Sequence, residues 1–269
     1  MTGVRGELEG IGVLITRPRT QTGALASAVH ALGGRPVLFP GVEIVETSDA
    51  ALDVALDALR SAQFAVFVSP NAARIGMQCV RRRGGLPVGI RVAAVGPGTA
   101  QELKNAGLRE IIMPRDGYDS EALASHPALV AVEGLRIVIF RGEGGRQWLA
   151  ERLRARGAQV VFAQCYRRER PAAPFAALDA LIRGGDLHAW TATSAQIVDN
   201  LFEAAGADAA EWLRRAEAFV SHPRIAARAF SKGARAICVT AAGDAGLVAG
   251  LRAWFGRLRP IATQTRQRT

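Results

Sequence analysis

Short apolar runs rich in β-branched residues alternate along the chain with segments of helical spacing. The runs are GVLIT (12–16), FAVFV (64–68), RVAAV (91–95), RIVIF (136–140), AWTAT (189–193), AFV (218–220) and AICVT (236–240). Between two of them, Leu52, Leu56 and Leu59 fall at positions i, i+4 and i+7, as on one face of a helix. Nearly continuous apolar strands separated by helices are typical of parallel sheets covered on both faces. The pattern therefore predicts an α/β protein.

The chain also resembles itself at a nearly constant spacing. The segment that begins with GVLIT is similar to the one that begins with RIVIF, and Arg17 matches Arg141 at an offset of 124. FAVFVSPNAARIG is similar to HAWTATSAQIVDN, with Ser69 opposite Ser194 at an offset of 125, and VAAVGPGTA aligns with AFVSHPRIA. Three matched blocks in one register predict two similar, flavodoxin-like lobes with parallel sheets.

The second apolar run of each copy, VLFP or VFAQCY, predicts where the chain crosses from lobe to lobe. We therefore expect one lobe from residues 1–38 and 168–258, a second from 42–163, linkers at 38–42 and 163–168, and a basic tail at 259–269. A chain that crosses twice would form a cleft between its lobes, with strand C-termini and helix N-termini facing it.

Four turns between an expected strand and an expected helix consist of small residues: SPNAA (69–73), GPGTA (96–100), RGEGG (141–145) and SAQ (194–196). Such turns leave helix N-terminal N–H groups open to an anion. Helix capping alone explains any single serine, asparagine or threonine there. Their number favours a ligand with several carboxylates or phosphates. RGEGGRQ meets neither nucleotide fingerprint, because it lacks the Gly-Lys-Ser/Thr ending and has Gln147 where GxGxxG needs its third glycine.

The 269 residues carry a formal charge of +10, from 34 Lys and Arg against 24 Asp and Glu. Five arginines follow the last acidic residue, Asp244, and Arg81, Arg82 and Arg83 form another basic run, so much of the excess lies outside the expected cleft. A nucleic-acid-binding protein is one alternative that the charge raises, but only 6% of the residues are aromatic and no recognition motif is present. We therefore expect no nucleic-acid partner.

No apolar run approaches the roughly 18 to 20 residues of a membrane helix, and the first ten residues have no signal-like core. Three cysteines without CxxC spacing and four scattered histidines predict reduced thiols and no metal site. We expect a cytoplasmic protein with no membrane contact.

Six motifs follow one another along the chain: TRP near the start, FVSPNA, VAAVGPGTA, SEAL (120–123), IFRGEGGRQWLAERLRARGAQV and the tyrosine of CYRRERP. Their order and spacing over residues 10–256 resemble those of the uroporphyrinogen-III synthase family. VSHPRIA departs from the IGPxTA-like turn that many members have at this point. The extra basic tail is a second departure from the family pattern. The resemblance implies a cofactor-free monomeric enzyme whose substrate is hydroxymethylbilane, a linear tetrapyrrole with eight carboxylates. The product would be uroporphyrinogen III, formed by dehydration, cyclisation and inversion of the last pyrrole ring. The resemblance leaves open whether the enzyme makes transient contacts with neighbouring enzymes of the pathway.

The resemblance also implies roles for individual residues. Tyr166 matches the family tyrosine proposed to assist the departing hydroxide, since a phenol is protonated at neutral pH and can donate its proton. Its alternative role is to form part of the wall of the site by packing, without acting as an acid. Thr99 matches a family threonine near the substrate, with helix capping as its alternative role. We further expect these residues to bind substrate carboxylates: Arg17, Arg141 and Arg224 through their guanidinium groups, and Ser69, Asn71, Gly142, Ser194 and Ser221 through N–H groups.

A two-lobed binding module that senses an anionic metabolite without turning it over is the other alternative. The tyrosine match and the lack of an output domain disfavour it.

Overall fold

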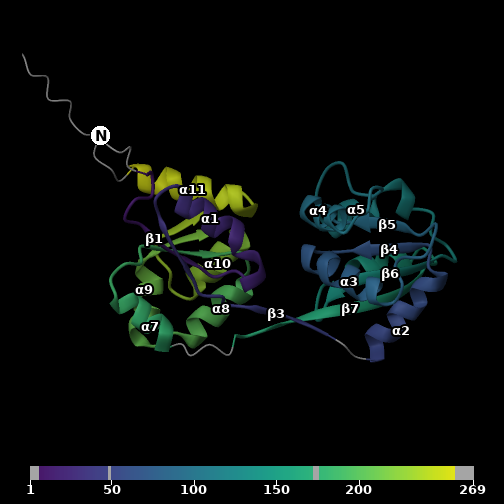
Figure 1. The fold of residues 1–269 in the computed structure, drawn as a ribbon, viewed down its shortest axis with the longest axis horizontal. Coiled ribbons are helices and arrows are strands. Elements are labelled where there is room, and N and C mark those ends of the chain that lie inside the picture. The colour runs from purple at the N-terminus through teal and green to yellow at the C-terminus, as the bar shows by residue number, and fades with distance from the viewer. Residues whose placement is uncertain (1–5, 48–49, 172–175, 258–269) are drawn as a thin grey trace, which may run out of the picture. The chain divides into compact units, whose positions relative to one another are not determined.

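The computed structural model describes residues 6–47, 50–171 and 176–257 (Figure 1). The chain divides into two compact units. Unit 1 consists of Met1–Glu43 and Glu169–Thr269, and unit 2 of Ile44–Arg168.

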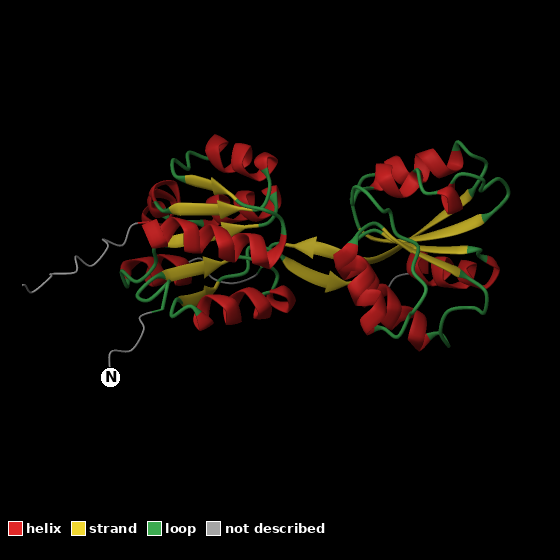
Figure 2. Ribbon diagram, turned by 90° about the horizontal axis from the view of Figure 1, so that it is seen from above, coloured by secondary structure: helices red, strands yellow, loops and turns green. Residues whose placement is uncertain are grey.

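Unit 1 contains a five-stranded sheet in the order β10-β9-β8-β1-β2, in which all neighbours are parallel. Its strands are β1 (Gly12–Ile15), β2 (Arg35–Leu38), β8 (Ala189–Ala192), β9 (Glu217–Val220) and β10 (Ile237–Val239). Its helices are α1 (Gly23–Ala31), α7 (Ala176–Arg183), α8 (Ala195–Ala204), α9 (Ala207–Arg215), α10 (Pro223–Ser231) and α11 (Gly243–Arg257), with a 3₁₀ turn at Arg19–Gln21. Helices cover both faces of the sheet (Figure 2), so the central strands β1, β8 and β9 are buried along their whole length.

Unit 2 contains a sheet in the order β3-β7-β6-β4-β5, in which β7 pairs in parallel with β6, β6 with β4, and β4 with β5. Its strands are β3 (Glu43–Glu46), β4 (Phe64–Phe67), β5 (Arg91–Ala94), β6 (Arg136–Gly142) and β7 (Gln159–Glu169). Its helices are α2 (Ala50–Ala58), α3 (Pro70–Arg82), α4 (Pro97–Asn105), α5 (Ser120–Ala124) and α6 (Trp148–Arg154), with 3₁₀ turns at Leu59–Ser61 and Pro127–Leu129.

Side chains of unit 2 alternate between two apolar layers, as the period of two along a strand requires. Phe67 and Phe140, whose rings stack with centroids 4.5 Å apart, face α2, α3 and α4. Val66 and Ile139 face α5 and α6 on the other side of the sheet. The sheet is therefore held between two helical layers, and its carboxyl edge is left for the turns.

The two sheets show the internal repeat directly. The neighbour order β9-β8-β1-β2 of unit 1 recurs as β5-β4-β6-β7 in unit 2, and the paired strands are those that the sequence offset matches. Gly33 and Gly157, which are 124 residues apart like Arg17 and Arg141, both have positive φ, at 82° and 84°, where a side chain would be strained. The prediction of an α/β fold with two similar, flavodoxin-like lobes and parallel sheets is confirmed.

The segments expected as linkers have different local structures. Residues 39–42 connect β2 to β3, whereas residues 163–168 lie within β7 and pair with β6 as far as Tyr166. VFAQCY is thus part of a long strand, because its apolar side chains continue the buried layers of unit 2. The expected tail, 259–269, lies outside the described residues. In the described part of the chain, no helix is long and apolar enough to cross a membrane.

Candidate active site

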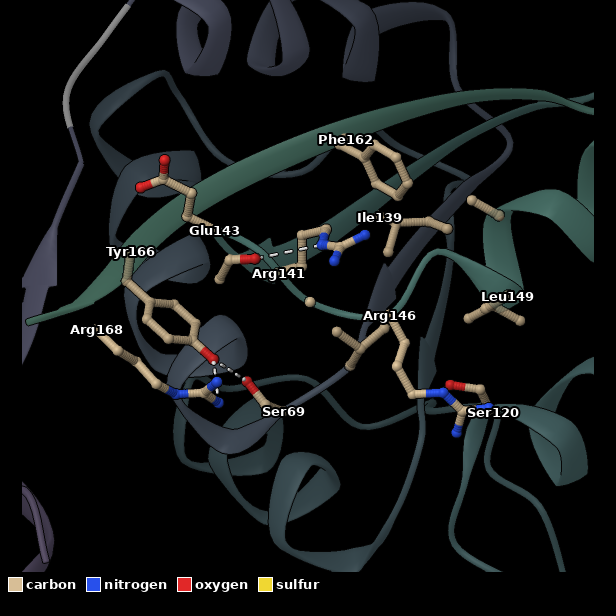
Figure 3. A pocket seen from close by; sticks show the side chains of 14 residues that line it. Ser69, Ser120, Ile139, Arg141, Glu143, Arg146, Leu149, Phe162, Tyr166 and Arg168 are labelled. Carbon is tan, nitrogen blue, oxygen red and sulfur yellow. Dashed lines mark hydrogen bonds between the residues drawn. The ribbon is translucent and has the colours of Figure 1, made fainter. Parts of the chain in front are cut away.

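A pocket of about 270 Å³ lies in unit 2 where β4 and β6 reach their carboxyl ends, beside β7. Ligands of open parallel sheets commonly bind at this edge, because the strand-to-helix turns meet there. Figure 3 shows the side chains that line it, which come from β6, β7, the turns after β4 and β6, α5 and α6. All of them belong to unit 2.

Tyr166 is buried, with 2% of its surface exposed, and its hydroxyl group reaches the pocket. Its phenol oxygen lies 3.1 Å from Ser69 Oγ and 3.5 Å from an Nη atom of Arg168 (Figure 3). Ser69 also caps α3, accepting a hydrogen bond of 3.1 Å from the N–H of Ala72. Because arginine can only donate, the phenol oxygen must be the acceptor of the Arg168 contact. The cap fixes Ser69, and Ser69 and Arg168 together fix the phenol.

A glycine and a bulge make room for the tyrosine ring. The pairing of β6 with β7 shifts between Arg141 and Gly142, which places Gly142 opposite Tyr166. A Cβ atom on Gly142 would lie 2.5 Å from Tyr166 Cζ and 2.9 Å from its hydroxyl oxygen. The phenol can therefore lie over this position only because the residue has no side chain.

Arg141 is the most deeply buried cation of the pocket, with 4% of its surface exposed. Its Nε donates a hydrogen bond of 3.3 Å to the carbonyl oxygen of Gly142, and its Cζ lies 4.6 Å from the centre of the Phe162 ring. No carboxylate of the described residues forms an ion pair with it. Burial lowers the pKa of its guanidinium below the ordinary value, and the nearby Tyr166 acts in the opposite direction. A buried cation without a carboxylate partner is costly unless an anion binds to it.

Two further arginines lie at the exposed side of the pocket. Arg146 donates to Glu121 at 2.6 Å, so its charge is partly compensated by the first turn of α5. Arg168 contacts the phenol oxygen and ring of Tyr166 and forms no ion pair among the described residues. The only acidic residue that lines the pocket itself is the exposed Glu143. Since Arg141 and Arg168 have no carboxylate partner among the described residues, the pocket is suited to an anion.

The structure thus brings together four of the residues predicted from the sequence: Ser69, Arg141, Gly142 and Tyr166. The two other candidates in unit 2, Asn71 and Thr99, lie in the first turns of α3 and α4. Both are buried, with 9% and 4% of their surfaces exposed, and neither lines this pocket.

In unit 1, Arg17 forms an ion pair with Asp244 in the first turn of α11. Its Nε atom is buried without a hydrogen-bond partner, and burial lowers the pKa of its guanidinium. Arg17 and Arg141 occupy matching positions of the repeat, but only Arg17 has a carboxylate partner among the described residues.

The other candidates of unit 1 lie at helix starts. Ser194 caps α8, accepting a hydrogen bond of 3.2 Å from the N–H of Ile197. At α10 the cap is His222, which accepts from the N–H of Arg224 at 3.0 Å, so Ser221 precedes the cap. The side chain of Arg224 is exposed.

The sequence interpretation missed the pocket residues Arg146, Phe162 and Arg168. No signal for them was present, because the sequence predicted a crossing segment where β7 lies. Strand alternation would also have misplaced Phe162: it packs in the layer of α5 and α6 and Tyr166 in that of α2, α3 and α4, since the register shift between Gln164 and Tyr166 interrupts the alternation.

Two flavodoxin-like units, one bearing a cationic pocket with a hydrogen-bonded tyrosine, define a two-lobed α/β protein. The family model described as uroporphyrinogen-III synthase HemD matches residues 23–248. The chain belongs to the uroporphyrinogen-III synthase family.

Several curated relatives are similar in sequence. The uroporphyrinogen-III synthase of Salmonella typhimurium is 37% identical over 160 residues, which cover 59% of this chain and 65% of the relative. The uroporphyrinogen-III synthase of Escherichia coli K12 is 32% identical over 163 residues, which again cover 59% of this chain and 65% of the relative. The putative uroporphyrinogen-III synthase of Methanothermobacter thermautotrophicus is 29% identical over 195 residues, which cover 71% of this chain and 77% of the relative. The chain thus spans slightly less than two thirds of the length of the two enterobacterial relatives.

Solved structures of the same family share the fold. A mutant uroporphyrinogen III synthase from Thermus thermophilus superposes with a TM-score of 0.61 at 19% identity, covering 92% of this chain and 99% of that one. The enzyme from Helicobacter pylori 26695 gives 0.60 at 10% identity, with 93% and 100% covered. At these identities the likeness supports the fold and says nothing about individual site residues.

Proposed function

We propose that this chain is an active uroporphyrinogen-III synthase, which converts hydroxymethylbilane to uroporphyrinogen III with loss of water and inversion of the last pyrrole ring. Membership of the family supports the proposal. The observation that carries it to this chain is the phenol of Tyr166, held by Ser69 and Arg168 at the wall of a cationic pocket.

In the first step the substrate loses its hydroxyl group. The pyrrole nitrogen supplies the electron pair that expels the hydroxyl, so a weak acid near the leaving oxygen is sufficient. Arg168 donates to the phenol oxygen of Tyr166, and either hydroxyl of the Ser69–Tyr166 pair can be the donor; when Ser69 donates, the phenol O–H is free to donate to the substrate. The C–O bond breaks as this proton moves to the hydroxyl oxygen, and water departs. The phenolate beside Arg168 regains a proton as the ring closes.

In the second step the enzyme has to select one of two ring closures, because the spontaneous closure yields the other isomer. This selection is a matter of holding the carboxylates so that the terminal ring attacks through its substituted carbon. The bond from that carbon to its original methylene bridge then breaks, and the ring closes onto this bridge through its unsubstituted α-carbon, which loses the proton that the phenolate regains. Arg141 is the member of the pocket suited to hold one of them, as a buried cation without a carboxylate partner among the described residues. The corresponding roles of Arg17, Asn71, Thr99, Ser194, Ser221 and Arg224, and a ligand position between the lobes, stay predictions. So does the expectation of a cytoplasmic, cofactor-free monomer.

The test is to incubate the protein with freshly made hydroxymethylbilane, oxidise the products and resolve isomers I and III. We expect isomer III to predominate. Isomer I alone, formed at the rate of the buffer control, would refute the proposal. If the protein bound the linear tetrapyrrole but left its spontaneous closure unchanged, the alternative of a non-catalytic sensor would be correct.

A further inference from the structure

The pocket of unit 2 is small compared with the proposed substrate. Its volume is about 270 Å³, just below the roughly 300 to 1,000 Å³ that accommodate drug-sized ligands. A tetrapyrrole with eight carboxylate side chains is much larger than a drug-sized molecule. The pocket therefore suits one ring with its side chains.

The inner wall of the pocket combines apolar surfaces with one cation. Ile139, Leu149 and Phe162 provide the apolar surfaces, and the Arg141 guanidinium lies among them (Figure 3). The walls match the faces of an aromatic ring, and the cation matches a carboxylate on a short side chain.

The loop after β6 passes directly beside the Arg141 guanidinium. A Cβ atom on Gly145 would lie 2.5 Å from an Nη atom of Arg141, so any side chain at this exposed position would press on the guanidinium. Glu143, on the same loop, forms no ion pair with Arg141, and Figure 3 shows the two side chains pointing in opposite directions. The loop therefore packs against the cation without neutralising it, and Arg141 still lines the pocket.

We propose that the pocket of unit 2 is a receptor for a single pyrrole ring, one carboxylate of which pairs with Arg141. The inference rests on the proposed function and deepens it: the ring that the Tyr166 phenol faces is recognised independently of the rest of the tetrapyrrole. A free monopyrrole that bears short carboxylate side chains then binds the same pocket and competes with the linear substrate.

Porphobilinogen, a monopyrrole with one acetate and one propionate side chain, is the probe. Its binding to the full-length protein is measured by isothermal titration calorimetry, and its effect on isomer III formation by initial rates. We expect one site per chain, with a Kd on the order of 0.3 mM for a ligand of this size, and competitive inhibition with a similar constant.

Two variants test the pocket, and a third serves as the matched control. Arg141→Met keeps the length of the side chain but removes the cation, and it raises the Kd of porphobilinogen by roughly tenfold or more. Gly145→Leu changes an exposed loop position and blocks the guanidinium with Arg141 still present, so it weakens binding without altering a buried residue. Arg152→Met makes the same chemical change on the exposed face of α6 and leaves the Kd as it is.

Saturable binding that both pocket variants weaken and the control variant preserves would support the receptor. Absence of saturable binding, or binding that Arg141→Met and Gly145→Leu leave unchanged, would overturn it. The two proposals can fail separately. A protein that makes isomer III without binding porphobilinogen refutes only the single-ring receptor. One that binds porphobilinogen through Arg141 but makes no isomer III supports the receptor and refutes the proposed enzyme activity.

Discussion

Replacing Gly142 by alanine tests whether this glycine exists to admit the Tyr166 ring. The added Cβ would lie 2.5 Å from Cζ and 2.6 Å from Cε2 of the tyrosine, closer than real Cβ contacts. The backbone at Gly142 is outside the positive-φ region, so the residue itself accepts a side chain and the whole cost comes from the ring. Overpacking of this kind costs about 1–3 kcal/mol, and losing the hydrogen bond to Ser69 adds about 0.5–1.5 kcal/mol.

A double-mutant cycle measures this cost, with the free energy of unfolding from urea titration as the readout. Gly142→Ala should destabilise the native protein and lower kcat for isomer III, because the displaced phenol leaves Ser69 and Arg168. In a Tyr166→Ala background the same change should cost almost nothing, which gives a coupling energy of about 1–3 kcal/mol. In the control background Tyr166→Phe the ring atoms remain, so most of the cost remains. Equal costs of Gly142→Ala in all three backgrounds would refute the reasoning.

Three further predictions concern other groups. Tyr166→Phe should lower kcat roughly several-fold to a hundredfold while product binding stays nearly intact; if binding is lost and bound substrate turns over normally, the residue is a wall. Glu217, buried on β9 with one oxygen unpartnered, has a pKa raised by burial, so the native state loses stability as pH rises from about 4.5 through that pKa. Glu217→Gln should therefore raise the unfolding midpoint at pH 7.5, with a gain that shrinks toward pH 4.5; a constant gain would contradict the assignment. Burial raises the pKa of Cys165 to about 12, so a thiol reagent at pH 8, followed by peptide mass mapping, should modify the partly exposed Cys238 first and Cys165 only on unfolding.

The fold could be predicted from the sequence because its cause is local. A central parallel strand is buried on both faces, so it must be an uninterrupted apolar run, and such runs are visible without a structure. The repeat then supplied the correspondence between lobes, since the order of matched strands in one sheet recurs in the other. The end of β7 was harder to predict, because residues that continue a strand and residues that leave a lobe can both be apolar.

The site was only partly predictable, because its contacts join distant parts of the chain. Ser69 and Tyr166 are 97 positions apart, and nothing local indicates that their oxygen atoms lie 3.1 Å apart. The repeat assigned Arg17 and Arg141 the same role, yet α11 gives Arg17 the partner Asp244. Arg168 lies two residues after Tyr166, beyond the apolar run VFAQCY, and its contact with the phenol oxygen is visible only in the structure.

The isomer composition formed from fresh hydroxymethylbilane tests the central claim most directly, when it is measured at a fixed short time over a series of protein concentrations. The account predicts that the fraction of isomer III rises with protein concentration until isomer I is suppressed, and that Tyr166→Phe shifts this rise to higher concentration. An isomer III fraction that stays at the buffer value at every concentration would contradict it.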